Sequence, residues 1–299
     1  MPYQSLNQQF LEYITIDKGL SLNTQLAYSS DIERYIQFIK PLAPKVSEII
    51  PEHIQNYLLH LVNDLKINEF SQARNLSSLR AFHKFLFIES ITTTNPMDYI
   101  DSPRLNRKLP TVLSIYEIEQ ILNAINTSTD LGLRNRTIIE VLYSSGLRVS
   151  ELINLPIQNI YPTEGFIRII GKGNKERLVP IGSIALKFID LYKESIRNHI
   201  QPKKGSEGIL FLNRRNAKLT RVMIFLIIKE LCQQAGLKKN ISPHSFRHSF
   251  ATHLIEGGAD LKAIQEMLGH ESITTTEIYT HFDTLHLREI HLTYHPRGK

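Results

Sequence analysis

A proline-containing segment divides this chain into two parts, and that division constrains the fold more than any other feature of the sequence. Residues 94–110 contain Pro96, Pro103 and Pro110. A helix cannot continue through such a segment, because each proline lacks the backbone N–H and clashes with the preceding turn. We therefore expect one domain over residues 1–100, a linker over 101–110 and a second domain over 111–299.

The first domain is expected to be a small unit of four helices, because apolar residues recur in it at steps of three and four. The apolar stripes are Phe10, Tyr13 and Ile14; Tyr28, Ile32, Tyr35, Ile36 and Ile39; Ile54, Leu58, Leu61 and Leu65; and Leu76, Leu79, Phe82 and Leu86. Asn23 is suited to cap the second helix, and Pro51 suits the first turn of the third. We interpret the aromatic members as core residues rather than as platforms for stacking bases.

The second domain is expected to combine helices with a small antiparallel sheet. Residues 166–181 contain two short apolar runs around Gly171 and Gly173, which is typical of a β-hairpin because glycine tolerates the positive φ angles of a tight turn. Helical patterns lie at 114–126, 131–145, 183–198, 219–235, 244–256 and 260–268, with a shorter pair near 272–291. The expected fold class is mainly α with a small antiparallel β-sheet, a helical domain being followed by an α+β domain.

Positive charge is concentrated in the second part of the chain. The formal net charge is +6, yet residues 1–100 hold 8 Lys and Arg against 10 Asp and Glu. Residues 101–299 hold 27 against 19. A basic domain suits a polyanionic partner, because each phosphate that it neutralises releases counterions. Nucleic acid is therefore a candidate partner.

Cysteine content and hydropathy bear on where the chain works. The sequence has one cysteine, Cys232, which excludes an internal disulfide framework and favours a reducing compartment. No apolar run approaches the roughly 20 residues that a membrane-spanning helix needs, and the N-terminus lacks the layout of a signal peptide. We expect a cytoplasmic protein that does not insert into a membrane, in which Cys232 is a small buried residue.

Two short stretches place arginine where it could bind a phosphate. Arg148 and Glu151 are three residues apart, so on a helix the carboxylate could hold the guanidinium in one orientation; an ordinary surface ion pair is the alternative. His244 and Arg247 share one face near the start of another expected helix, where free backbone N–H groups favour an anion. A fixed guanidinium and an imidazole that moves a proton near neutral pH are what phosphoryl transfer requires.

The last part of the chain carries two more candidates, His270 and Tyr279. The helix before them is expected to begin at the cap Asp260 and to end at Gly269. Its expected buried stripe is Leu261, Ile264 and Leu268. Ser272 can cap a further short helix that carries Tyr279, and this spacing allows the two candidates to converge.

The hairpin turn supplies one further candidate, Lys172. A lysine in a turn that folds over a DNA strand could protonate a leaving alkoxide. Lys175 and Arg177 follow closely, and spacing alone leaves the choice among the three open.

A metal site is not expected from the histidine spacing. His244 and His248 are four residues apart, as in some zinc helices. However, Ser245 stands where a metalloprotease helix has glutamate, and no third ligand is evident nearby in the sequence. We expect no metal and no other cofactor, and a structural or hydrogen-bonding role for His248.

Five blocks carry a family resemblance through their joint presence and their order. They are GLRVSEL, GKGNKERLVP, SPHSFRHSFATHL, LGH and TTTEIYTH, spread over residues 111–299. Together they closely resemble the tyrosine recombinase (phage integrase) family, and the N-terminal helices are similar to that family's SAM-like core-binding domain. Within the family the chain looks most like the XerD type of the bacterial Xer recombinases, because of its compact length, the GKGNKERLVP block and the ending LREIHLTYHPRGK.

The resemblance implies a catalytic set that is complete in this sequence. Its members are Arg148, Lys172, His244, Arg247, His270 and Tyr279. By the family pattern the two arginines bind the scissile phosphate, the lysine protonates the departing 5′ oxygen, the histidines support proton transfer, and the tyrosine is the nucleophile. Neither a metal nor a nucleotide is implied, because a phosphotyrosine ester keeps the energy of the cleaved bond for resealing.

The implied function is site-specific recombination, in which duplex DNA is cut and rejoined through a 3′-phosphotyrosine. We hypothesise that the two domains form a C-shaped clamp on duplex DNA and that four protomers assemble on two sites. The resemblance also implies a XerC-like partner recombinase, an FtsK-like DNA translocase and the resolution of chromosome or plasmid dimers at cell division. The alternatives are a mobile-element integrase of the same family, a type IB topoisomerase and a non-catalytic DNA-binding factor.

Further DNA contacts are expected from Arg80 and Lys84, which share one helix face, unless that face is simply solvated. The basic residues of the linker are Arg104, Arg107 and Lys108. They suit a connector between two domains that close on DNA, although a solvated connector would look the same.

The last expected helix, near 283–291, is apolar for a terminal element. Its apolar residues are Leu285, Leu287, Ile290 and Leu292. The family resemblance implies that this helix docks on a neighbouring protomer, and packing on its own domain is the alternative.

Overall fold

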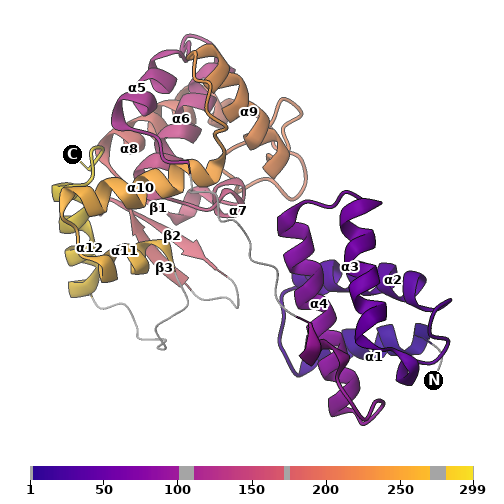
Figure 1. Cartoon of the computed structure of the whole chain (residues 1–299). Helices are drawn as coiled ribbons and strands as arrows, with labels where there is room; N and C mark the ends of the chain where they lie inside the picture. The colour runs from indigo at the N-terminus through magenta and orange to yellow at the C-terminus, as the bar shows by residue number, and fades with distance from the viewer. Residues whose placement is uncertain (1–2, 101–110, 172–175, 270–280, 299) are drawn as a thin grey trace. The chain divides into compact units, whose positions relative to one another are not determined.

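A computed structural model describes residues 3–100, 111–171, 176–269 and 281–298, and the chain forms two compact units, residues 1–108 and 109–299 (Figure 1). Lys172, His270 and Tyr279 lie outside the described residues, as do Arg104, Arg107 and Lys108. Among the residues that are described, no helix is both long and apolar enough to cross a membrane.

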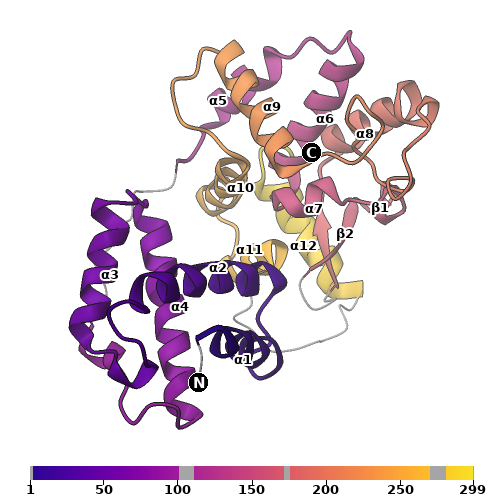
Figure 2. The ribbon, with the colours of Figure 1, turned by 90° about the vertical axis from the view of Figure 1, so that its right-hand side faces the viewer.

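The N-terminal unit contains four α-helices in its described residues 3–100, as the apolar stripes predict. They are α1 (Tyr3–Ile16), α2 (Leu22–Ile39), α3 (Pro51–Asn63) and α4 (Glu69–Ile88), with the short 3-10 helices η1 (Val46–Glu48) and η2 (Pro96–Tyr99). The helix α4 packs against α1, α2 and α3 (Figure 2). The core interpretation of the aromatic residues in this unit is confirmed, since Phe10, Tyr35 and Phe82 are fully buried and the partly buried Tyr13 and Tyr28 pack against the same core.

The ends of two N-terminal helices differ in detail from the prediction. Pro51 begins α3 as expected, but Ser21 rather than Asn23 precedes α2, and Asn23 lies inside the helix. Leu65 was wrongly assigned to a buried stripe. The helix α3 ends at Asn63, so Leu65 falls beyond it and is exposed.

The C-terminal unit surrounds a three-stranded antiparallel sheet with helices. The strands are β1 (Ile160–Tyr161), β2 (Phe166–Ile170) and β3 (Glu176–Pro180), in the order β1-β2-β3. The helices are α5 (Ile115–Asn123), α6 (Asp130–Ser145), α7 (Val149–Ile153), α8 (Ser183–Ser195), α9 (Arg221–Gln234), α10 (Pro243–Gly257), α11 (Leu261–Leu268) and α12 (His281–Tyr294), with the 3-10 helices η3 (Ile157–Asn159) and η5 (Arg197–His199). The central α6 packs on α8, α10 and β3 (Figure 1). The expected fold class is confirmed.

The predicted hairpin is formed by β2 and β3, whose register pairs Ile167 with Val179 and Ile169 with Arg177. The strand β1 was not predicted, because two residues are too few to show a period of two. Cys232 is buried in the core of this unit, and burial raises the pKa of its thiol to about 11, which fits the expected structural role.

The helix α11 has the predicted ends. The side chain of Asp260 accepts hydrogen bonds from the backbone N–H groups of Lys262 (3.0 Å) and Ala263 (3.1 Å), and Gly269 closes the helix at φ +66°. Ile264 and Leu268 are buried as expected. Leu261 is 60% exposed, so its place in the buried stripe was wrong.

The terminal helix α12 packs largely on its own unit. Leu287 and Ile290 are buried in one apolar cluster with Phe250 of α10, whereas Leu285 and Leu292 remain exposed. Two of the four apolar residues that the sequence suggested for contact with a neighbouring protomer are therefore used in the core of the unit itself. The other two remain on the surface.

Two stacked histidines hold the end of the chain against α6. The rings of His291 and His295 have centroids 4.9 Å apart, and both are buried. Nε2 of His291 donates to the carbonyl of Ser144 (2.7 Å), while Nδ1 of His295 accepts from the backbone N–H of Arg297 (3.0 Å). Burial lowers the pKa of His291 to about 4, and burial, followed by the charges of His291, His253 and Arg297, lowers that of His295 well below its usual value.

Acid should consequently destabilise the C-terminal unit. The unfolded chain binds a proton on each histidine near pH 6.5, whereas the folded chain does not. The contribution of these neutral histidines to the free energy of unfolding is therefore fully present above about pH 6.5, and it is lost as the pH falls toward 4. Between pH 7 and pH 5, His291 alone should cost about 2 kcal/mol of unfolding free energy, measured by urea unfolding. His291→Gln should reduce this loss and His286→Gln, at an exposed position on the same helix, should not; equal slopes in both variants would contradict the assignment.

Candidate active site

Arg148 is fixed in place at the start of α7. Its backbone N–H donates to Oε2 of Glu151 (2.8 Å) and its guanidinium donates to Oε1 of the same carboxylate (3.0 Å). A second guanidinium nitrogen donates to the carbonyl of Gly269 (3.0 Å). The side chain is 38% exposed, so guanidinium donors remain available on the solvent side. The predicted pairing with Glu151 is thus present, and it orients the guanidinium rather than forming a loose surface contact.

Arg247 is held by backbone carbonyls, and among the described residues it makes no hydrogen bond to a side chain. From the second turn of α10 it donates to Gly146 (2.8 Å) and to Leu268 (2.6 Å), and it is buried. Burial, followed by the charge of Arg148, lowers the pKa of Arg247 to about 10. Since this value lies well above neutral pH, the group keeps its positive charge under physiological conditions. A charged guanidinium thus lies in a largely desolvated environment, where a low dielectric constant strengthens its attraction for an anion.

His244 lies one turn before Arg247, directly after the proline that begins α10. Partial desolvation lowers its pKa, and the positive charges of His248, Arg247 and Arg148 lower it further. Because its pKa is lowered from the ordinary 6.5, the exposed imidazole is predominantly neutral at pH 7, a state in which it can accept a proton. Among the described residues, no group of three or more potential ligands is placed to hold a metal ion.

Arg177 is a third guanidinium at this site, and the sequence did not predict its contacts there. From β3 it donates to both carboxylate oxygens of Glu151 (2.9 Å each) and, through Nε, to the carbonyl of Met267 (3.1 Å). It is 7% exposed. The sequence left Arg177 open as a general acid beside Lys172 and Lys175, and this burial in an ion pair argues against that role.

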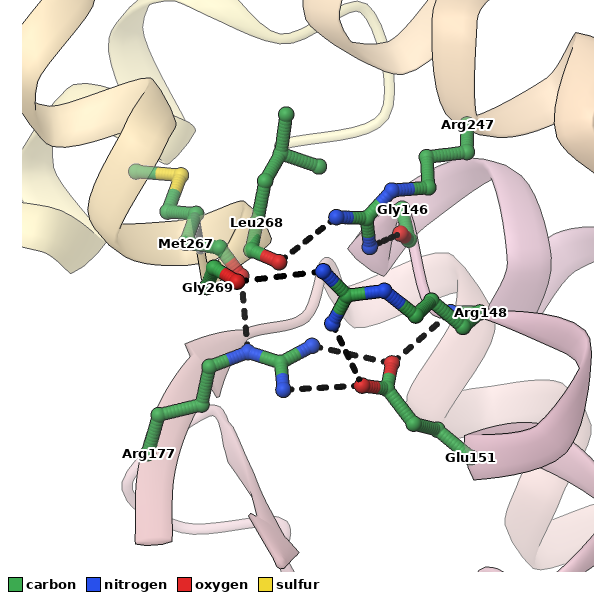
Figure 3. Close-up of polar contacts among 8 residues, drawn as sticks. All are labelled: Gly146, Arg148, Glu151, Arg177, Arg247, Met267, Leu268 and Gly269. Atoms are coloured by element: carbon green, nitrogen blue, oxygen red, sulfur yellow. Dashed lines mark hydrogen bonds and ion pairs between the residues drawn. The ribbon is translucent and has the colours of Figure 1, made fainter. Parts of the chain in front are cut away.

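Arg148, Arg177 and Arg247 form what we call the three-arginine cluster (Figure 3). The carbonyls of Met267, Leu268 and Gly269, at the end of α11, each accept from a different one of these arginines. The last carbonyls of a helix lack partners within the helix and carry partial negative charge, so cations are favoured there. The cluster therefore joins α7, α10 and β3 to the end of α11, and it gathers three positive charges around one carboxylate.

Arg80 and Lys84 are both exposed on α4. Arg80 also donates to the carbonyl of Ile100 (3.1 Å), which ties it to the end of its own unit. A contact of either residue with DNA stays a prediction, as does any role of the basic residues between the two units.

Comparison with known proteins agrees with this architecture. The model of the phage integrase family matches residues 111–286, and that of the phage integrase N-terminal SAM-like domain matches residues 8–90. A relative named tyrosine recombinase XerD from Chlorobaculum tepidum is 42% identical over 99% of this chain and 98% of its own length. A protein of the same name from Staphylococcus aureus is 40% identical over 99% of this chain and all of the relative.

Solved structures share the fold at lower identity. XerH recombinase bound to its palindromic difH substrate matches with a TM-score of 0.72 and 24% identity, over 95% of this chain and 83% of that one. The Tn1549 transposon integrase in complex with transposon right end DNA matches with a TM-score of 0.74 and 19% identity, over 94% of each chain.

The chain belongs to the phage integrase family and is a site-specific tyrosine recombinase. The long matches to proteins named XerD confirm the resemblance to the XerD type that the motif blocks indicate. They do not favour the alternatives of a mobile-element integrase, a type IB topoisomerase or a non-catalytic DNA-binding factor.

Proposed function

We propose that this recombinase cuts each DNA strand with Tyr279 as nucleophile and with the scissile phosphate bound by Arg148 and Arg247. The observation that carries the proposal is the arrangement of these two guanidiniums. Each is held by acceptors of its own chain, and each has N–H donors beyond those that bond to described residues. Donors fixed before the reaction stabilise the charge that develops on the phosphate oxygens without reorganising.

The proposed reaction needs no outside energy source. The phenol oxygen of Tyr279 attacks phosphorus, the bond to the 5′ oxygen breaks, and the ammonium of Lys172 donates a proton to that oxygen. His244, neutral at pH 7, and His270 support the transfer of the phenolic proton and hold the phosphate. The resulting 3′-phosphotyrosine ester conserves the energy of the broken phosphodiester bond. Attack by a 5′ hydroxyl therefore reverses the step and seals a strand.

We further propose duplex DNA as the substrate, bound by four protomers on two sites, with a XerC-like recombinase as partner and an FtsK-like translocase as activator. The support is the length and identity of the matches to proteins named XerD, together with the DNA in the structures of XerH and the Tn1549 integrase. The process would be the resolution of chromosome or plasmid dimers at cell division, in the cytoplasm.

Covalent trapping tests this proposal. Selection from random duplexes with the purified chain, alone and with a XerC-like protein, yields the bound site, which is then prepared with a nick near the cleavage position. We expect a covalent adduct at a 3′ phosphate, and peptide mapping should place the DNA on Tyr279. Bound DNA without an adduct, or an adduct on another residue, would contradict the proposal. Relaxation of a plasmid without recombination of paired sites would indicate a topoisomerase instead.

A further inference from the structure

We propose that Arg177 is a positioning residue for the cleavage reaction, acting on the phosphate-binding Arg148 through the carboxylate that they share. This inference rests on the proposed function of Arg148 and extends it to a residue with no place in the family's catalytic set. Three observations support it: the charge balance around Glu151, the anchoring of the hairpin, and the contact with the end of α11.

The first observation is the sharing of one carboxylate by two guanidiniums. Arg177 donates to both oxygens of Glu151 at 2.9 Å, and Arg148 donates to one of them at 3.0 Å. Burial alone would raise the pKa of Glu151, but hydrogen bonds and charge from Arg177, ahead of those from Arg148, lower it. Arg177 is therefore the main counter-ion of Glu151. The carboxylate can orient Arg148 without cancelling its positive charge, which stays available to a phosphate.

The second observation is the position of Arg177 in the hairpin. It is the second residue of β3, where it pairs with Ile169 of β2, and Lys172 lies in the stretch of chain between these strands. Its bidentate ion pair links this hairpin directly to α7, which begins next to Arg148. A planar guanidinium that makes two parallel bonds fixes orientation as well as distance. The proposed proton donor is thus attached to the strand pair that this ion pair ties to the phosphate-binding arginine.

The third observation is the close fit of Arg177 against the end of α11. Its Nε donates to the carbonyl of Met267 at 3.1 Å. A Cβ placed on Gly269 would lie 3.1 Å from both Cδ and Nε of Arg177, and Gly269 also has a positive φ of +66°. A side chain at position 269 would therefore press on Arg177, which would have to shift, and it would also strain the backbone at this φ. In the sequence, His270 follows directly.

The test compares cleavage by four proteins on the nicked duplex. We expect Arg177→Met to slow adduct formation at saturating DNA by about 10²-fold. The Kd for the same duplex should stay within about threefold of wild type. Arg177→Lys should recover part of the rate, since an ammonium can replace the charge but not the bidentate geometry. The matched control is Arg168→Met, which removes from the same hairpin a 3.9 Å ion pair with Glu176 and a 3.0 Å hydrogen bond to Asn159, and which should cleave like wild type.

A double variant separates positioning from simple loss of structure. In Arg177→Met the carboxylate of Glu151 is left with Arg148 alone and partly cancels its charge. Adding Glu151→Gln removes that negative charge, so the double variant should cleave faster than Arg177→Met. A merely structural role predicts a double variant that is no faster. Cleavage by Arg177→Met at the wild-type rate would overturn the proposal directly.

Thermal unfolding without DNA tests the coupling of Arg177 to Glu151 independently of cleavage. If the wild-type chain forms no adduct, that result counts against the proposed function alone. Glu151→Gln should lower the Tm of the wild-type chain, because it takes charge from two ion pairs. In the Arg177→Met background the same change should lower it less or raise it, because an undercompensated buried carboxylate is removed. Equal changes in both backgrounds would show that Arg177 and Glu151 are not coupled, and would overturn the proposal.

Discussion

Replacing Tyr279 by phenylalanine should abolish the covalent adduct and all recombination while leaving DNA binding intact. The substitution removes one oxygen and keeps the ring, so any packing by the aromatic side chain is preserved. Without the phenol no other group in the proposed mechanism can form the phosphotyrosine ester. By analogy with other catalytic nucleophiles, the expected loss is on the order of 10⁴–10⁶ in rate.

The measurement is the yield of adduct on the nicked duplex, with the Kd for the same duplex determined in parallel. Tyr294→Phe is the matched control, because Tyr294 is a partly exposed tyrosine at the end of α12. It should form the adduct at the wild-type rate. An adduct that persists in Tyr279→Phe would assign the nucleophile to a different residue and remove the central step of the proposed reaction.

The reactivity of a phenol explains why the nucleophile needs the arginines. The ordinary pKa of tyrosine is about 10, so little phenolate is present at neutral pH. Positive groups around the reacting phosphate favour the anionic form of an incoming phenol and also stabilise the charge on the phosphate. Arg247, which stays protonated although burial lowers its pKa to about 10, can serve both purposes.

Elements whose signals are local in the chain could be predicted from the sequence. The helix α3 begins at Pro51 and α11 is capped by Asp260 and closed by Gly269, because a cap depends only on residues within one turn. The pairing of Arg148 with Glu151 has the same origin, since three residues separate them. Errors arose where a stripe was extended past the end of a helix, as with Leu65, and in the first turn of a helix, as with the cap Asn23 and the exposed Leu261.

The remainder of the three-arginine cluster depends on tertiary packing and leaves no local signal. Arg177 and Glu151 are 26 residues apart, so their ion pair exists only once β3 lies beside α7. The acceptors of Arg247 are the carbonyls of Gly146 and Leu268, and every residue offers such a group. A motif block can indicate that Arg247 matters, but the partners that fix its orientation become visible only in the folded chain.

Arg247→Ala should cause the largest loss of activity among the described residues. It removes a buried charge from the proposed phosphate site, and the expected loss in cleavage rate is about 10²–10³-fold. It also leaves the carbonyls of Gly146 and Leu268 without their donor, so the Tm should fall as well. Arg247→Lys should restore little of the rate, because a single ammonium cannot reproduce the planar fork that holds both carbonyls and still presents donors outward.

A second buried arginine shows how the loss of catalysis can be told apart from the loss of stability. Arg197 of η5 is also buried and also donates to two backbone carbonyls, those of Ile209 (2.9 Å) and Glu207 (2.7 Å), neither of which belongs to the three-arginine cluster. Arg197→Ala should therefore lower the Tm as Arg247→Ala does, whereas its rate of adduct formation per folded molecule should stay at the wild-type level. If the two variants lost cleavage in equal proportion at a temperature where both are folded, the effect of Arg247 would be one of stability, and its assignment to the scissile phosphate would have to be abandoned.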